Sequence, residues 1–255
     1  MTKLLGQSVF VDNKPGAAGN VAMAEVGAAT DQHTLILGHI GTLAVNPYMF
    51  DKLPYDPVKD FEPVALLARV PMLFAVGPAN RSTTLAQFVT EAKAAPGKLN
   101  YGSAGNGSAG HLAFEMLKLS AGIDVTHVPY KGTGAQTTDL LAGNIDAAAA
   151  GLPGFLPHVK VGKLRILAVG AAHRLPAIPG VPTVAELGYA NFESSQWFGL
   201  LVPAKTPANV IDRLHAEARK ALLSDSVKHR LDEDSSTPMP LGPQEFSAFI
   251  TKEQK

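Results

Sequence analysis

Short apolar and β-branched runs alternate along this chain with longer segments whose apolar residues recur at helical spacing. Strands separated by helices in this way are typical of an α/β architecture with parallel strands. The apolar runs predict strands near residues 8–11, 34–37, 64–67, 72–76, 99–102, 125–128, 146–150, 164–169 and 198–202.

Three of the intervening segments have one apolar face, because their apolar residues lie three and four positions apart. They contain Leu85, Phe88, Val89 and Ala92; Leu112, Ala113, Met116 and Leu117; and Val210, Ile211, Leu214 and Ala218. These residues predict three amphipathic helices. The charged stretch at 225–234 predicts a solvated helix and loop that carries no site.

The apolar strands at 72–76 and 198–202 bracket a middle block of βαβ units, and each is followed by Pro or Gly-Pro. A chain that leaves one domain, builds a second and returns through another strand forms a two-stranded hinge with a cleft between two lobes. We therefore expect a first lobe from residues 1–74 and 201–255 and an inserted second lobe from residues 75–200. Small ligands favour such clefts.

The charges disfavour a polyanionic partner, because 22 Lys and Arg balance 22 Asp and Glu and neither sign forms a block. We expect no binding to nucleic acid. Cysteine is absent, which removes disulfides and thiol catalysis. No apolar run approaches the roughly 18 to 20 residues that span a bilayer, and the first five residues lack the features of a signal peptide.

The strongest local signal is the Gly- and Ser-rich segment at 100–111, between a predicted strand and a predicted helix. Glycines let the backbone approach a ligand, and the free N–H groups of a first helical turn favour a carboxylate or phosphate. Ser103 and Ser108 add hydroxyl donors. A simple turn with Ser108 as the helix cap explains the segment equally well.

Several enzyme motifs fail in this segment. No Gly-Lys-Ser or Gly-Lys-Thr follows the glycines, so it is not a nucleotide P-loop. Gly105, Gly107 and Gly110 have dinucleotide spacing, but Asp124 precedes the next strand instead of ending it. Neither serine sits in a nucleophile elbow. A small-molecule hydrolase using Ser108 and His111 stays open as the alternative, although no acid completes a triad.

The histidines show no metal-ligand spacing, so we expect no metal and no cofactor. Other strand ends add candidate ligand contacts, because ligands of α/β sheets collect beyond the carboxyl ends of strands. Tyr130 and Gly151 follow strands of the second lobe, and Thr42 and Asn46 follow one of the first. A packed turn explains Tyr130 as well as a ligand contact does, and the end of a helical turn is the favoured explanation for Asn46.

Several motifs of this chain resemble those of the receptors of tripartite tricarboxylate transporters, also called Bug-type extracytoplasmic solute-binding proteins. They include Asn-Lys-Pro-Gly-Ala-Ala-Gly-Asn at 13–20 and His-Val-Pro-Tyr-Lys-Gly at 127–132. The others lie at 46–47, 60–64, 96–103, 105–108, 111–113, 162–165, 167–169, 179–186 and 197–200. They occur in family order over nearly the whole chain.

This resemblance implies an α/β fold of the type II periplasmic-binding-protein class, whose two lobes close around a small organic acid. It implies a periplasmic receptor, not an enzyme, that works with membrane permease subunits. Backbone amides and ordered waters would hold the carboxylates. Carried onto this chain, the contacts would be Ser103, Ala104, Gly105 and Ser108 from the second lobe, with Thr42 and Asn46 from the first; His111 would be structural.

The chain also departs from the family at its start. Family members begin with a signal peptide, a first strand, a Pro- and Gly-rich loop and an acid that reaches the ligand. Here Met1 falls in the last turns of the first helix, which leads into the strand expected at 8–11. The resemblance therefore implies an N-terminally truncated chain whose first lobe lacks a strand, and a binding-defective remnant is a third alternative.

Overall fold

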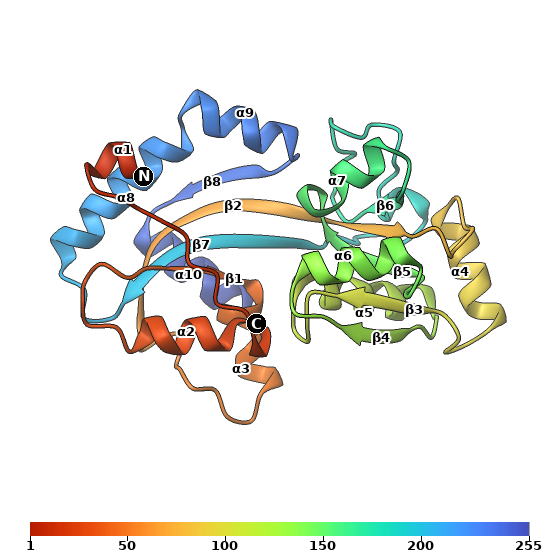
Figure 1. Cartoon of the computed structure of the whole chain (residues 1–255), viewed down its shortest axis with the longest axis horizontal. Helices are drawn as coiled ribbons and strands as arrows, with labels where there is room; N and C mark the ends of the chain where they lie inside the picture. The colour runs from red at the N-terminus through yellow and green to blue at the C-terminus, as the bar shows by residue number, and fades with distance from the viewer. Residues whose placement is uncertain (255) are drawn as a thin grey trace. The chain divides into compact units, whose positions relative to one another are not determined.

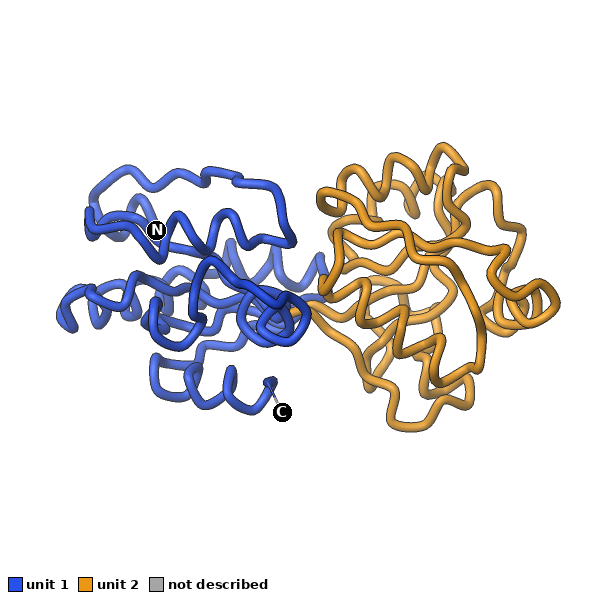
Figure 2. Tube along the Cα trace, turned by 90° about the horizontal axis from the view of Figure 1, so that it is seen from below, with its two compact units in different colours: residues 1–69, 197–255 blue, residues 70–196 orange. Residues whose placement is uncertain are grey.

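The computed structural model describes residues 1–254 and forms two compact units. The first unit contains residues 1–69 and the segment from Trp197 onward, and the second contains residues 70–196 (Figure 2). The chain passes between the units within strand β2 (Phe61–Val76) and within strand β7 (Ser195–Pro203). The boundaries expected from the sequence, 74/75 and 200/201, fall a few residues further along the same two strands.

The first unit is a small antiparallel sheet with helices around it (Figure 1). Strand β1 pairs with β7, and β8 pairs with the first half of β2. Its core includes Met23, Leu43, Phe61, Trp197 and Phe246. Its remaining elements are α1 (Thr2–Leu5), the 3-10 turn η1 (Ala17–Gly19), α2 (Asn20–Gly27), β1 (Ile36–His39), the π turn η2 (Gly41–Val45), α3 (Asn46–Met49), α8 (Ala208–Leu222), α9 (Asp225–Glu233), β8 (Thr237–Leu241) and α10 (Pro243–Glu253).

The second unit is a mixed sheet in which β5, β3 and β4 are parallel neighbours and β2 joins β5 antiparallel. Strand β6 pairs antiparallel with the second half of β2. Each parallel strand leads into a helix at its carboxyl end (Figure 1). The elements are α4 (Leu85–Ala94), β3 (Asn100–Ser103), α5 (Ala109–Ala121), β4 (Thr126–Pro129), α6 (Thr133–Ala142), β5 (Ala147–Gly151), α7 (Leu152–Lys160), β6 (Arg165–Val169) and the 3-10 turn η3 (Ala185–Leu187).

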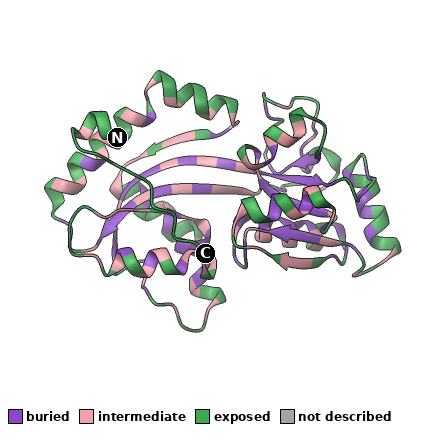
Figure 3. Ribbon diagram, in the orientation of Figure 1, coloured by how far each residue is buried: buried purple, intermediate pink, exposed green. Residues whose placement is uncertain are grey.

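The α/β fold class is confirmed, and α4, α5 and α8 confirm the three amphipathic helices. Burial follows the predicted pattern (Figure 3): the central strands are mostly buried, whereas the charged helix α9 buries no residue. The expectation of parallel strands holds only for β3, β4 and β5, because β2 and β7 enter the sheets in the opposite direction to their neighbours.

Two strand predictions are wrong. Residues 8–11 are not a strand, because they find no strand to pair with among residues 1–254, and Phe10 and Val11 are 84% exposed. The strands expected at 64–67 and 72–76 are one strand, β2, which keeps its direction but changes its pairing partners. Pro71 lacks an N–H, and the pairings of β2 with β8 and with β5 end at Arg69 and begin at Met72, on either side of it.

Candidate functional site

The carboxyl ends of β3, β4 and β5 form one edge of the second unit, and α5, α6 and α7 begin there. Gly110 brings the first turn of α5 against β5, where a Cβ atom would collide with the carbonyl oxygen of Ala149. Gly154 brings α7 near α6, because a Cβ atom there would lie 2.8 Å from Thr133 Cγ2. The edge therefore gathers the amino-terminal ends of three helices, which favour negative charge.

Residues 104–108, the cradle loop, connect β3 to α5 with two glycines in the left-handed region, Gly105 at φ 131° and Gly107 at φ 74°. The loop is tied to the end of β4, because Gly132 N–H donates to Ala104 O at 3.2 Å. Ser108 caps α5, its Oγ accepting His111 N–H at 3.3 Å. These bonds within the protein therefore fix the conformation of the cradle loop.

The cradle loop and the first turn of α5 leave backbone donors open. The N–H groups of Asn106, Ala109 and Gly110 have no hydrogen-bond acceptor among the residues described. Donors at the start of a helix of 13 residues point along its dipole. An anion at this edge would satisfy them.

Ser103, at the end of β3, is fully buried and anchors the cradle loop from below. Its Oγ accepts the N–H of Gly105 at 3.2 Å and lies 2.7 Å from His127 Nε2. The imidazole of His127 stacks on that of His111, with ring centroids 4.2 Å apart. Burial lowers the pKa of His127 to about 4 and also lowers the pKa of His111.

Tyr130 and Gly151 lie at the other two strand ends of this edge. Tyr130 N–H donates to Ser103 O at 3.0 Å, and its hydroxyl donates to Asp139 Oδ2 at 2.7 Å. Burial raises the pKa of Tyr130 to about 12. A Cβ atom on Gly151 would lie 2.6 Å from Val70 Cγ1, so this glycine allows a close approach to β2.

The structure thus brings Ser103, Ala104, Gly105, Ser108 and Tyr130 together at one edge. Gly151 ends a strand of the same sheet.

Thr42, predicted as a ligand contact, belongs to the first unit and is 2% exposed. Its Oγ donates to His39 O at 3.2 Å, and its carbonyl accepts the hydroxyl of Tyr55 at 2.8 Å. A Cβ atom on Gly19 would lie 2.7 Å from Thr42 Cγ2, so η1 packs directly on this residue. The side chain of Thr42 is therefore enclosed by its own unit.

Asn46 is fully buried and is linked to Thr42 through the hydrogen bonds of Asn20 and Tyr55. Its Nδ2 donates to Asn20 Oδ1 at 2.6 Å and to Ala18 O at 3.3 Å, while its Oδ1 has no partner among residues 1–254. Ala17 and Ala18 have φ of 45° and 56°, which strains a residue with a Cβ atom. An open oxygen accepts an N–H or O–H group but repels a carboxylate oxygen.

Sequence reasoning missed His127 and Asn20 as partners of the predicted residues. His127 stands 24 positions from Ser103, and Asn20 stands 26 from Asn46. Both lie in motifs noted in the sequence, at 127–132 and 13–20, which was the available signal. The pairings themselves depend on the register of β3 with β4 and on the packing of η1.

The geometry does not support Ser108 and His111 as a catalytic pair. Ser108 Oγ binds the backbone N–H of His111, and His111 Nδ1 accepts the N–H of Gly107 at 3.1 Å. Neither contact lets an imidazole take a proton from Ser108. Ser103 does meet an imidazole, but it is 0% exposed and closed to a substrate.

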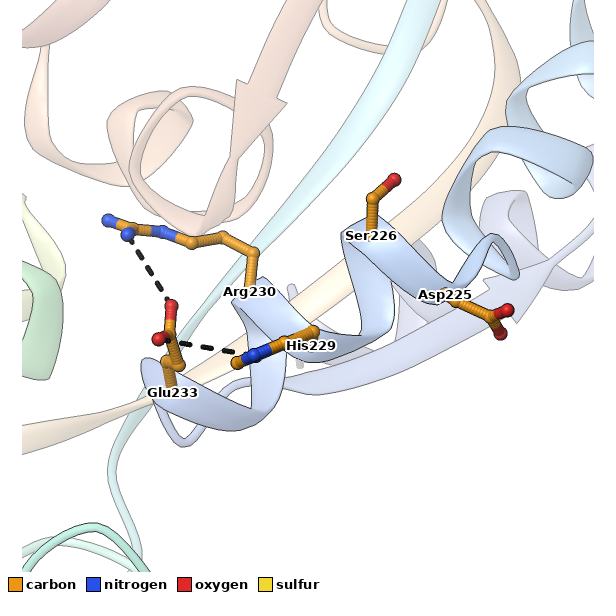
Figure 4. A pocket seen from close by; sticks show the side chains of 5 residues that line it. All are labelled: Asp225, Ser226, His229, Arg230 and Glu233. Atoms are coloured by element: carbon orange, nitrogen blue, oxygen red, sulfur yellow. Dashed lines mark ion pairs between the residues drawn. The ribbon is translucent and has the colours of Figure 1, made fainter.

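Two depressions of the described chain are lined by residues of the first unit alone, and one of them is formed by residues 27–30, 32, 59–60 and 203–206. The other depression, on α9, is lined by residues of one exposed helix, Asp225, Ser226, His229, Arg230 and Glu233, and Glu233 pairs there with Arg230 and His229 (Figure 4). Among residues 1–254 no group of three His, Cys, Asp or Glu is placed to hold a metal ion. Within that range, no helix has the length and apolar character to cross a membrane.

Comparison with known proteins gives one consistent match. The model of the tripartite tricarboxylate transporter family receptor matches residues 1–255. Protein BugT of Bordetella pertussis is 34% identical over 251 residues, which cover 98% of this chain and 77% of that protein.

Solved structures are similar over the same range. An R. palustris protein solved with adipate has a TM-score of 0.96 and 34% identity, covering 99% of this chain and 85% of that one. MatC from Rhodopseudomonas palustris, solved with bound malate, has a TM-score of 0.92 and 32% identity, with coverage of 99% and 87%. The periplasmic binding protein BugD has a TM-score of 0.94 and 28% identity, with coverage of 99% and 85%.

Proposed function

This chain belongs to the family of tripartite tricarboxylate transporter receptors, and we propose from this that it captures a small organic carboxylate at the edge formed by β3, β4 and β5. The family and the fold are those of solute-binding receptors, which are not enzymes. The adipate and malate of the two R. palustris structures support a carboxylate as the class of solute.

One observation carries the proposal: the open backbone donors of Asn106, Ala109 and Gly110. These N–H groups sit where the helix dipole of α5 adds to their own partial charge, so an anion gains from both. A carboxylate has two oxygens that each accept more than one hydrogen bond, which suits several adjacent amides. Amides recognise the carboxylate alone, so the remainder of the solute is left for other groups to select.

The predicted contacts have different roles in this proposal. Ala104, Gly105 and Ser108 shape the cradle loop, while Ser103 and Tyr130 hold it to β4. Gly151 keeps the start of α7 close to β2 at the same edge. Thr42 and Asn46 remain predicted contacts of the first unit, with Asn46 Oδ1 offering an acceptor to a solute hydroxyl or to water.

Isothermal calorimetry at pH 7.5 tests the proposal with a panel of succinate, adipate, malate and citrate. Each is matched by its diamide or triamide, which preserves shape and removes charge. We expect at least one acid to bind, to raise the melting temperature as mass action requires, and to remain chemically unchanged. Absence of binding across the panel, or equal binding of acid and amide, would contradict the proposal.

The receptors of this family are periplasmic and belong to transporters, so we propose that this chain acts in the periplasm and delivers its solute to membrane permease subunits. Release of the native protein by osmotic shock, with loss of solute uptake on deletion of its gene, would support this. Retention in the spheroplast fraction would argue against it.

A further inference from the structure

Four aromatic rings form a continuous stack beneath the cradle loop, in the order Phe114, Tyr101, His127 and His111. Their centroids are 4.0, 4.9 and 4.2 Å apart in that order. Phe114 and Tyr101 are buried in the core of the second unit, whereas the two imidazoles are only partly buried. The stack therefore connects the core to the loop through two titratable rings.

Both imidazoles hold a left-handed glycine of the loop. His111 Nδ1 accepts the N–H of Gly107 at 3.1 Å, directly. His127 acts through Ser103, whose Oγ lies 2.7 Å from its Nε2 and accepts the N–H of Gly105 at 3.2 Å. An Nδ1 that accepts a hydrogen bond carries no proton, so His111 is neutral with its proton on Nε2 in this arrangement.

A proton on His111 Nδ1 would remove this anchor. The ring N–H would then face the N–H of Gly107, two donors that repel each other at 3.1 Å. Protonation of both stacked rings would also place two positive charges about 4 Å apart. The cradle loop would lose the bond that fixes Gly107 just before the first turn of α5.

The charged groups around the pair do not cancel this effect. Glu115 favours the protonated form of His111, but its Oε1 already accepts from Tyr101 at 2.7 Å and from Lys118 at 2.8 Å. Lys118 opposes protonation of both imidazoles. Burial contributes most to the lowered pKa of each ring, and with Lys118 it keeps them neutral near pH 7.

We propose that neutral His111 is a positioning residue for the solute site and that its protonation releases the cradle loop, so that acid weakens solute binding. This inference rests on the proposed carboxylate function, and it adds that pH regulates binding at that same site. The direction of the pH effect follows from the lowered pKa of His111. The cradle loop is held at neutral pH, and its bond to His111 is lost as the pH falls through this pKa, which lies below the ordinary histidine value of about 6.5.

A first measurement needs no solute. Nitrogen-15 NMR of the imidazoles from pH 8 to pH 4 should show His111 as the Nε2–H tautomer at high pH. The amide resonance of Gly107 should move with the titration of His111. A Gly107 chemical shift that does not change with this titration, or a neutral His111 in the Nδ1–H tautomer, would overturn the inference.

A second measurement compares affinities for the acid that binds best at pH 7.5, in the wild type and two variants. His111→Asn keeps an acceptor at the position of Nδ1 but does not titrate, whereas His111→Leu has no acceptor. His229→Asn, an exposed change on α9, is the matched control. Because the solute's own titration affects every protein equally, the comparison isolates the imidazole.

From pH 7.5 to pH 5, we expect the wild type to lose several-fold more affinity than His111→Asn, and His229→Asn to follow the wild type. His111→Leu should bind about tenfold more weakly at both pH values while keeping its fold by circular dichroism. Identical pH profiles for the wild type and His111→Asn would overturn the inference. If no acid binds at pH 7.5, the carboxylate proposal fails, and the Gly107 titration alone decides the role of His111.

Discussion

The candidate contacts of the two units differ in what their hydrogen bonds leave open. In the first unit, Thr42, Asn46, Asn20 and Tyr55 bond mainly to one another, and what remains open is a carbonyl oxygen, Asn46 Oδ1. In the second unit, side chains tie down the cradle loop while backbone N–H groups stay open. One arrangement offers an acceptor and the other offers donors, so only the second suits an anion.

The two groups of candidate contacts are also stabilised in different ways. The first-unit group relies on buried side-chain amides, whose loss leaves unpaired polar atoms. The second-unit loop relies on glycines that permit close backbone approach and on helix starts that need an anion or water. Substitutions should therefore damage stability in the first unit and both stability and affinity in the second.

The largest effect should follow Gly110→Ala. Its Cβ atom would collide with the carbonyl oxygen of Ala149, which cannot move aside as a side chain can. We expect a loss of about 3 kcal/mol in the free energy of unfolding, at the upper end of overpacking costs, together with weaker carboxylate binding as α5 shifts. Urea unfolding and calorimetry measure the two effects.

The matched control is Gly134→Ala in the first turn of α6, where a Cβ atom meets open space. It should raise stability by roughly 0.5–1 kcal/mol, as alanine does in a helix, and leave affinity unchanged. Equal effects of the two substitutions would mean that α5 is not pressed against β5.

A smaller effect should follow Asn46→Ala. Removing the side chain breaks its bonds to Asn20 and Ala18, at a cost of roughly 1–2 kcal/mol in the free energy of unfolding. Affinity for an acid that has no hydroxyl, such as adipate, should change less than threefold, because the open atom of Asn46 is an acceptor and repels a carboxylate oxygen. A tenfold loss of affinity at unchanged stability would instead assign Asn46 to the solute.

The smallest effect should follow Glu233→Gln on α9. The pairs of Glu233 with Arg230 and His229 lie on an exposed helix, where ion pairs contribute little. We expect the free energy of unfolding to change by less than about 0.5 kcal/mol, with unaltered carboxylate affinity. A measurable loss of affinity would show that the depression on α9 takes part in solute binding.

The sequence predicted the parts of the fold that depend on local pattern. Leu85, Phe88 and Val89 recur at helical spacing, and they form the buried face of α4. Residues 8–11 have strand composition too, but a strand exists only when another strand accepts its hydrogen bonds, and composition does not say whether one is near. The runs at 64–67 and 72–76 form one strand for a related reason, since β2 continues through Pro71, where no pairing needs an N–H.

At the site, the sequence predicted the loop but not what fixes it. The glycines and serines at 103–108 were visible as a segment between a strand and a helix whose backbone can approach a ligand. The contact between Ser103 and His127 requires β3 and β4 to pair with Tyr101 opposite His127, which no local pattern encodes. The tautomer of His111 likewise follows only from the position of Gly107.

A two-dimensional ¹H–¹⁵N NMR titration of the protein with the acid that binds best observes the proposed donors directly. We expect the amide protons of Asn106, Ala109 and Gly110 to move downfield together and to saturate at the calorimetric affinity, while the matched amide compound leaves them in place. Saturable binding without any shift of these three amides would mean that the open backbone donors at the start of α5 do not capture the carboxylate.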